Sequence, residues 1–294
     1  MKKVEKILGI IGGSGLYDIK GLKNKKWVKV ESAFGLPSDE ILFAELEGLE
    51  IRFLPRHGRG HVLAPSEINY KANIEALKSI GVTEILSISA VGSLREDFMP
   101  GDFVLVDQFV DRTYARKKSF FEEGLVAHVS MANPVCQRNG NHLLQAAKDE
   151  DIKVHEKGTY LVMEGPQFST KAESEIYRTW SCDVIGMTNM PEAKLAREAE
   201  ICYTSVAMVT DFDCWHPNHD NVTVDSIIKV MTNNAQNAKN LIVKIAPLFL
   251  NDDTSDNCSC KRSLDNSIIT APNMRKKEVI EKLKSILNRI NINT

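Results

Sequence analysis

The stretch KILGIIGGSG at residues 6–15 carries a β-branched apolar run directly into a turn of three glycines and one serine. Such a run predicts a buried strand over residues 6–11, and the glycines after it allow backbone N–H groups to converge on an anion. The loop is not a dinucleotide fingerprint, because Asp18 occupies the third glycine position, and it lacks the Gly-Lys-Ser/Thr ending of a P-loop. A nicotinamide oxidoreductase is therefore not indicated, whereas an anion site and an ordinary tight turn both stay open.

Outward from this segment, short β-branched runs alternate with longer amphipathic stretches, a pattern typical of an α/β fold. No internal repeat and no clean linker divides residues 1–250, so we expect one catalytic domain with a mixed central β-sheet flanked by helices. We expect residues 251–294 to belong to the same domain, as a polar linker over 251–270 and an amphipathic helix over 275–290. The expected strands are 6–11, 41–46, 49–54, 84–91, 102–110, 159–163, 183–187 and 201–209, and the expected helices are 65–80, 140–150, 170–180, 191–200 and 225–250.

The charge balance excludes several classes of partner. Among 294 residues, 37 basic and 39 acidic side chains leave no bulk field that would attract nucleic acid or an anionic membrane. The basic start superficially resembles a signal peptide, but the apolar run after it breaks at Gly12 and no small-residue cleavage site follows. No stretch approaches the roughly 20 apolar residues of a membrane span. We therefore expect a cytoplasmic protein.

The cysteines fall into two groups. Cys136, Cys182, Cys202 and Cys214 are widely spaced in apolar sequence, which is typical of buried, reduced thiols. Cys258-Ser259-Cys260 stands in the polar tail, and no further Cys or His lies nearby in the sequence at the paired spacing of a zinc site. We therefore expect no metal, and we interpret the pair as either a redox couple or two free thiols, peripheral to catalysis.

Two segments after expected strands carry groups suited to phosphate. Residues 55–61, PRHGRGH, place two arginines and two histidines at a strand end, where open α/β sheets bind ligands. Arginine offers bidentate geometry to phosphate oxygens, although a solvated basic turn would have the same composition. Residues 87–93, SISAVGS, end a strand in small hydroxyl side chains that suit phosphate or sugar.

A pair of carboxylates is the strongest local feature of the chain. Asp211 and Asp213 follow an apolar strand at positions i and i+2, so in extended chain they point to the same side. Like charges at this distance push one pKa upward, which equips one carboxyl group to deliver a proton, whereas two solvated turn aspartates are the alternative. The turn 164–169 adds a carboxylate, an amide and Phe168, which is by default a core residue.

Together these segments resemble the trimeric purine nucleoside phosphorylase family, on its methylthioadenosine phosphorylase branch. The resemblance runs in order from about residue 7 to residue 250 and weakens after Asn251. It rests on GIIGGSGL at 9–16, RHG at 56–58, NYKAN at 69–73, GSL at 92–94, EGPQFS at 164–169 and DFDCW at 211–215.

The resemblance implies a nucleoside phosphorylase fold, no cofactor, inorganic phosphate as co-substrate and a homotrimer. Ser14 and Ser89 stand where threonine is frequent in the family, and both keep the hydroxyl. His128 corresponds to a histidine that lines the 5′-substituent pocket from the neighbouring subunit. By resemblance, phosphate binds Ser14, Arg56, His57, Ser89, Ala90 and Thr188; the ribose and base contact Phe168 and Met187; Asp211 and Asp213 read the purine; Ser169 and Val224 help to set substrate preference.

The implied activity is reversible phosphorolysis of S-methyl-5′-thioadenosine, in purine and methionine salvage. Breaking the N-glycosidic bond develops positive charge on the ribose and negative charge on the purine, which a phosphate dianion and an acid at N7 would stabilise. A 6-oxopurine nucleoside phosphorylase on the same scaffold is one alternative, but it tends to carry asparagine where this chain has aspartate. A non-catalytic adenine-nucleoside sensor is another, although such a protein needs no phosphate site.

Overall fold

The computed structural model describes residues 6–13, 15–217, 224–290 and 292, and these form a mixed β-sheet between helices. At the centre of the sheet, β1 pairs in parallel with β4 and β5, and β5 pairs in parallel with β11. The carboxyl ends of these four strands therefore meet at one edge. The strands are β1 Ile7–Gly12, β2 Lys23–Val28, β3 Ile41–Leu46, β4 Leu49–Pro55, β5 Glu84–Ser93, β6 Phe103–Val106, β7 Gln108–Asp111, β8 Val154–His155, β9 Thr159–Val162, β10 Val184–Gly186 and β11 Cys202–Asp211.

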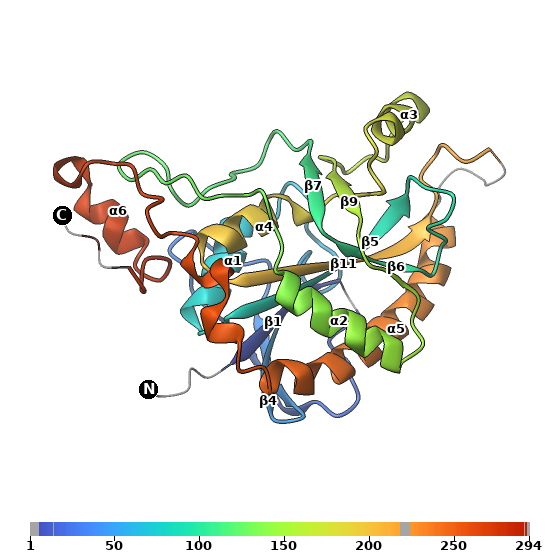
Figure 1. Cartoon of the computed structure of the whole chain (residues 1–294), viewed down its shortest axis with the longest axis horizontal. Helices are drawn as coiled ribbons and strands as arrows, with labels where there is room; N and C mark the ends of the chain where they lie inside the picture. The colour runs from blue at the N-terminus through green and yellow to red at the C-terminus, as the bar shows by residue number, and fades with distance from the viewer. Residues whose placement is uncertain (1–5, 14, 218–223, 291, 293–294) are drawn as a thin grey trace.

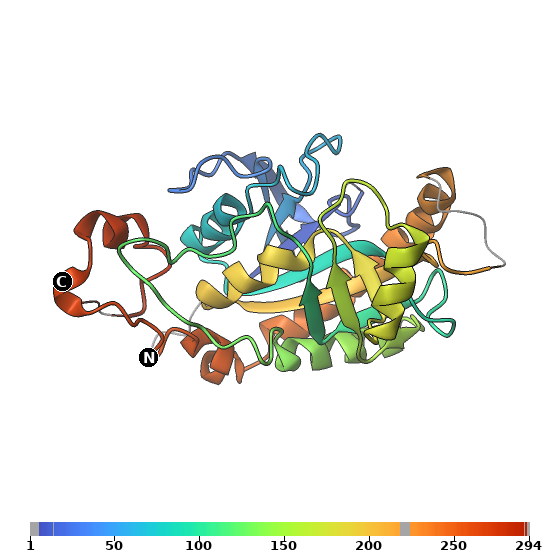
Figure 2. The same ribbon diagram turned by 90° about the horizontal axis from the view of Figure 1, so that it is seen from above.

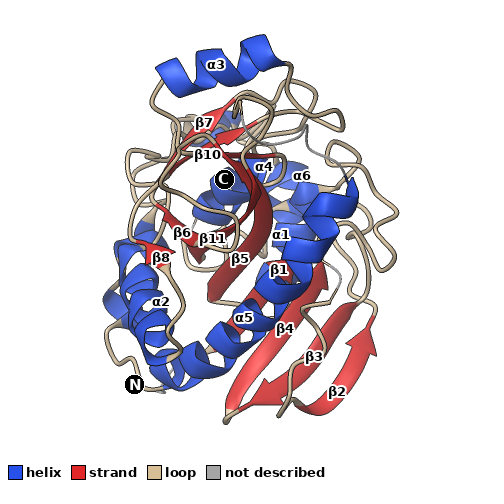
Figure 3. Ribbon diagram, turned by 90° about the vertical axis from the view of Figure 1, so that its right-hand side faces the viewer, coloured by secondary structure: helices blue, strands red, loops and turns tan. Residues whose placement is uncertain are grey.

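The sheet buries both of its faces, which explains the continuous apolar runs of its central strands. Along β1, Ile7 and Ile11 belong to one hydrophobic cluster, whereas Leu8 and Ile10 belong to a second. Helices α1 and α4 contribute to the first cluster, and α2 and α5 contribute to the second, so the sheet lies between the two pairs (Figure 3). The helices are α1 Tyr70–Ser79, α2 Gln137–Asp149, α3 Lys171–Thr179, α4 Asn189–Glu198, α5 Val224–Leu250 and α6 Lys277–Lys282.

The predicted fold class is confirmed, with three local differences. Helix α1 begins at Tyr70 rather than near residue 65, because the Asn69 side chain caps it by accepting from the Ala72 amide at 3.1 Å. The strand expected over 102–110 is two strands: β6 pairs with β11, and β7 pairs with β9 after a break at Asp107. The edge strand β2 was not predicted, since three of its six residues are lysines.

The tail beyond α5 is more structured at its start and less helical at its end than predicted. Residues 251–270 contain two short 3-10 helices, Ser255–Asn257 and Ser259–Arg262, and the terminal helix shrinks to α6. Figures 1 and 2 both show this tail running along one side of the molecule, with α6 at its far end. The tail is held by apolar side chains that join the first hydrophobic cluster, Leu283 and Ile286 among them. It is also held by polar contacts: the Leu264 amide and Arg289 both donate to the buried Glu200, at 3.0 and 2.6 Å.

Because α5 packs against the sheet, truncating a side chain on its buried face should lower the stability of the fold measurably. Ile242 lies on its buried face and is fully inaccessible. Ile242→Ala should lower the free energy of unfolding by about 2–5 kcal/mol, because the surroundings fill the resulting cavity only in part. Chemical denaturation measures the change. The control is Lys244→Ala on the same helix, which removes a surface ion pair with Glu150 at the end of α2 and should cost about 1 kcal/mol or less. Equal losses in the two variants would contradict this packing.

Candidate active site

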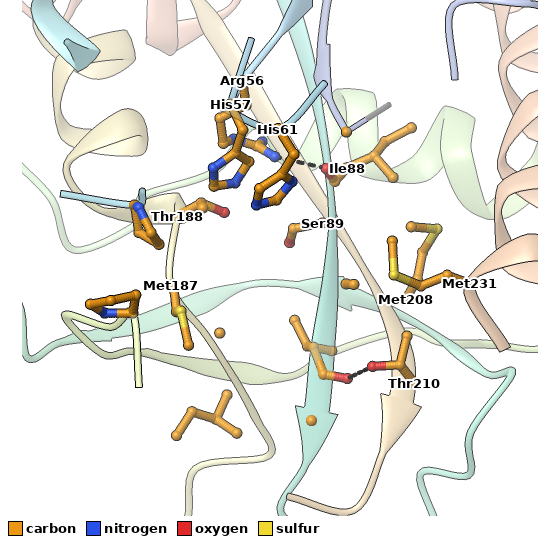
Figure 4. A pocket seen from close by; sticks show the side chains of 18 of the residues that line it. Arg56, His57, His61, Ile88, Ser89, Met187, Thr188, Met208, Thr210 and Met231 are labelled. Atoms are coloured by element: carbon orange, nitrogen blue, oxygen red, sulfur yellow. Dashed lines mark hydrogen bonds between the residues drawn. The ribbon is translucent and has the colours of Figure 1, made fainter. Parts of the chain in front are cut away.

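A pocket of about 550 Å³ lies at the shared carboxyl edge of β1, β4, β5 and β11 (Figure 4). This placement follows from the parallel pairing, since strand ends at one edge deliver their loops to the same cleft. Of the predicted residues, nine line the pocket: Arg56, His57, Ser89, Ala90, Phe168, Met187, Thr188, Asp211 and Asp213. Ser14 lies outside the described residues.

Arg56 is held in a buried ion pair that the sequence did not reveal. Its Nε and Nη2 donate to the two carboxylate oxygens of Glu192 at 2.8 and 3.1 Å, and both side chains are almost wholly inaccessible. Nη2 also donates to the Ser87 hydroxyl at 2.7 Å, and Nη1 donates to the Ile88 carbonyl at 3.0 Å. The bidentate face expected to meet phosphate is therefore occupied by Glu192. What Arg56 brings to the pocket is a guanidinium group fixed in place, with its charge paired by Glu192. Burial lowers its pKa, but the Glu192 carboxylate more than offsets this and keeps the group charged.

His57 is held in one tautomer by the loop that follows it. The Leu63 carbonyl can only accept, so Nδ1 donates to it at 2.8 Å and Nε2 is left as the free nitrogen of the neutral ring. Burial, together with the charge of Arg56, lowers the pKa of His57 to about 4. The ring stacks on His61 at 4.1 Å between centroids, and Figure 4 shows both rings projecting towards Ser89 and Thr188. The neutral ring is thus suited to accept from a protonated oxygen of a ligand.

Ser89 and Thr188 face each other across this end of the pocket (Figure 4). Thr188 is the N-cap residue of α4, yet its side chain makes no capping hydrogen bond among the described residues. A hydroxyl group and a helix N-terminus both favour an anion. Together with Arg56 and His57, they make this the end of the pocket best suited to an anion, and it is called the anion-binding end below.

The two aspartates lie at the other end, where β11 finishes. Asp211 accepts from the Thr210 hydroxyl at 2.7 Å and from the Asp213 amide at 2.8 Å, so a tight turn brings the second carboxyl back towards the first. Burial raises the pKa of both carboxyl groups, and for Asp211 the repulsion from Asp213 is the smallest cause. Desolvation, more than the like charge that the sequence suggested, therefore favours the protonated form of Asp211.

Gly92 makes room for this carboxyl pair. A Cβ atom at that position would lie 2.9 Å from the Asp211 Oδ1 and 3.3 Å from the Asp213 Cβ. Position 92 therefore requires glycine, because a side chain there would push the Asp211 carboxyl group out of its place in the pocket.

Four of the predicted residues lie in surroundings that need separate description. Phe168 is half exposed on the pocket wall and is not the core residue that its type suggested. Ser169 lies behind that wall, where its carbonyl accepts from the Cys214 thiol at 3.2 Å. Val224 begins α5, but its side chain lies outside the described part of the chain. His128 is exposed on a loop away from the lining residues and joins the tail through its amide, which donates to the Ser267 carbonyl at 2.9 Å.

Three methionines line the pocket and are called the methionine wall; Met187 was expected there by resemblance, whereas Met208 and Met231 escaped the sequence analysis. Met187 stands on one side of the pocket and Met208 and Met231 on the other (Figure 4). Methionine is unbranched and polarizable, so such a wall adapts to an apolar or sulfur-containing group. Met208 on β11 and Met231 on α5 belong to separate elements, so they left no local signal in the sequence.

The Arg56–Glu192 pair predicts a large effect of a small change. Glu192→Gln removes one charge of a buried pair that also accepts from the Ser87 and Tyr203 hydroxyls at 2.6 and 2.8 Å. The free energy of unfolding should fall by about 3–5 kcal/mol, because the Arg56 charge is left uncompensated in the interior. Denaturant titration measures this change in the free energy of unfolding. The control is Glu281→Gln, which alters an exposed ion pair. A Glu192→Gln variant as stable as this control would show that the pair does not matter.

Comparison with known proteins places this chain in a family. The family model of the phosphorylase superfamily matches residues 7–247. The S-methyl-5′-thioadenosine phosphorylase of Rhodospirillum rubrum is 59% identical to this chain, and the alignment covers 97% of each protein. That of Cereibacter sphaeroides is 54% identical, and the alignment covers 97% of this chain and 98% of the relative.

Solved structures agree with the sequence relatives. A methylthioadenosine phosphorylase from an Antarctic soil metagenomic library is 47% identical, with a TM-score of 0.91 over 97% of this chain and 100% of its own. The methylthioadenosine phosphorylase of Schistosoma mansoni, solved with adenine, is 35% identical, with a TM-score of 0.81 over 88% and 97%. By sequence and fold, the chain belongs to the phosphorylase superfamily.

Proposed function

We propose that this chain catalyses the reversible phosphorolysis of S-methyl-5′-thioadenosine to adenine and 5-methylthioribose 1-phosphate, which serves purine and methionine salvage. The observation that carries the proposal is one pocket with an anion-binding end, an apolar methionine wall and a protonatable carboxyl pair. The names of the relatives at 54–59% identity point to the same reaction. Phosphate is the co-substrate, and we expect no cofactor and a cytoplasmic enzyme.

At the anion end, phosphate would lie among His57, Ser89 and Thr188, with the positive charge of Arg56 beneath it. Its own negative charge stabilises the cationic ribose that develops as the glycosidic bond breaks, and its oxygen then bonds to the anomeric carbon. The chain's part is to hold phosphate in line with that carbon, because positioning alone accounts for much of such a reaction's acceleration.

At the other end, Asp211 would hold a proton near N7 of the departing base. Burial raises its pKa, so more of the carboxyl stays protonated near neutral pH than for a surface aspartate. Protonation or a strong hydrogen bond at N7 neutralises the charge that develops on the purine. Asp213, which lies next to it, would accept from the 6-amino group of adenine.

The methionine wall favours a methylthio substituent over a hydroxyl, since the hydroxyl would lose hydrogen bonds to water. His128 indicates a contribution from a second subunit, because it is exposed and does not line the pocket of its own subunit. We propose that it completes the 5′ end of a neighbouring subunit's pocket in a homotrimer. Active protein with a monomeric mass by light scattering would contradict this assembly.

A 6-oxopurine nucleoside phosphorylase is the nearest alternative on this scaffold. An ionised aspartate meets a 6-oxo group with lone pair against lone pair, and such a mismatch among buried polar groups costs about 1–3 kcal/mol. The two buried aspartates therefore favour aminopurines. A non-catalytic nucleoside sensor is disfavoured by the anion-binding end, which a nucleoside does not need.

The carboxyl pair predicts distinct effects for two matched substitutions. Asp211→Asn should lower kcat for adenine release about 100-fold or more, because an amide cannot deliver a proton. Asp213→Asn should instead narrow the preference for methylthioadenosine over inosine, since its amide can donate to a 6-oxo group. Steady-state kcat/KM for both nucleosides, in the wild type and both variants, measures these effects. A wild type that prefers inosine would overturn the assignment.

The anion end predicts a selective effect on phosphate. Thr188→Val keeps the shape of the side chain but removes its hydroxyl, a hydrogen bond to a charged group worth about 1.5–3 kcal/mol. The KM for phosphate should rise about 10- to 100-fold, while the KM for methylthioadenosine changes little. Initial rates with each substrate varied at saturation of the other separate the two constants. An equal rise in both constants would mean that Thr188 does not contact phosphate.

A further inference from the structure

Four cysteines that are far apart in the sequence come together at the end of the sheet opposite the pocket. The sulfurs of Cys136, Cys202, Cys258 and Cys260 all lie within 4.8 Å of one another. Cys202 begins β11, whereas Asp211 ends it, so the cluster stands about 30 Å from the carboxyl pair along the strand. The sequence spacing suggested no metal-ligand partners for Cys258 and Cys260. The fold supplies them from segments more than 50 residues away.

The geometry fits a tetrahedral metal. With zinc–sulfur bonds of about 2.3 Å, the sulfurs of a tetrahedral site lie roughly 3.8 Å apart. The Cys136 and Cys258 sulfurs are 3.6 Å apart. All six cysteines of the chain are free thiols in the structure, so no disulfide accounts for this approach.

The surroundings also suit a site that is closed to water and negatively charged. Cys136, Cys202 and Cys260 are buried, and Cys258 is partly buried against them. Cys136 is the N-cap residue of α2, but its side chain makes no capping hydrogen bond among the described residues, and a helix N-terminus favours a thiolate. Arg138 and Arg197 lie close enough to interact electrostatically with the cluster, and this offsets the nearby Glu84 carboxylate.

We propose that Cys136, Cys202, Cys258 and Cys260 bind one zinc ion in a closed, all-thiolate structural site. Binding displaces the four thiol protons to solvent and leaves a tetrahedral complex of charge −2, with no redox step. Four protein ligands leave no open position for substrate, so the ion takes no part in the reaction. Its effect is to fasten the tail, through Cys258 and Cys260, to the starts of α2 and β11.

Metal analysis of the full-length protein, purified without chelator, tests this proposal. We expect about one zinc per chain by elemental mass spectrometry. A thiol-specific mercurial should release it in step with four thiols. Replacement by cobalt should give the intense visible bands of tetrahedral cobalt thiolate. Four free thiols without bound metal would overturn the proposal. So would two disulfides, detected by thiol counting under denaturing conditions, or iron bound in place of zinc.

Variants distinguish the effect of losing the metal from the effect of losing a thiol. The double variant Cys258→Ser, Cys260→Ser should hold at least tenfold less zinc and have a lower Tm, while its KM values stay within about twofold of wild type. Cys260→His keeps a zinc ligand and should retain the metal. The matched control is Cys182→Ala, which removes a buried thiol outside the cluster and should leave zinc unchanged. A double variant with full zinc content would place the metal elsewhere.

Discussion

The buried pair of Arg56 and Glu192 is the interaction on which the site depends. Charges that are removed from water must be compensated locally, and each of these two groups is compensated mainly by the other. The pair joins the end of β4 to the start of α4 and takes in Ser87 of β5 and Tyr203 of β11. It therefore fixes the floor beneath the pocket and holds the Arg56 guanidinium, rather than the Glu192 carboxylate, against the lining of one end. Phosphate binding is expected at that end for this reason.

Much of this arrangement could be predicted from the sequence, because its signals are local. The glycine loop after β1, the cationic loop after β4 and the carboxyl pair after β11 each follow an apolar run. Parallel strands bring such ends together, so a single cleft follows from three separate motifs. The hairpin of β3 and β4 was equally predictable, since alternating residues flank Glu47-Gly48. The resemblance to a known family supplied the roles of individual residues.

What could not be predicted depends on contacts between distant segments. In the sequence, nothing distinguishes Glu192 from other acidic residues of a helix, and its partner Arg56 lies 136 positions earlier. The four cysteines stand on three elements, and only the fold shows that the tail returns to the starts of α2 and β11. The polarity of the tail indicated a weakly structured linker, because periodicity does not reveal anchoring by a few specific contacts. The structure thus adds a second centre, separate from the reaction, to the chemistry that the motifs indicated.

The central claim is that phosphate itself attacks the ribose within this one pocket. The most direct test is to incubate the enzyme with methylthioadenosine and phosphate labelled uniformly with ¹⁸O, and to identify the sugar product by mass spectrometry. The account predicts 5-methylthioribose 1-phosphate that carries all four labelled oxygens, with no adenine released when phosphate is omitted. Free methylthioribose formed at the same rate without phosphate would identify a hydrolase and contradict the account.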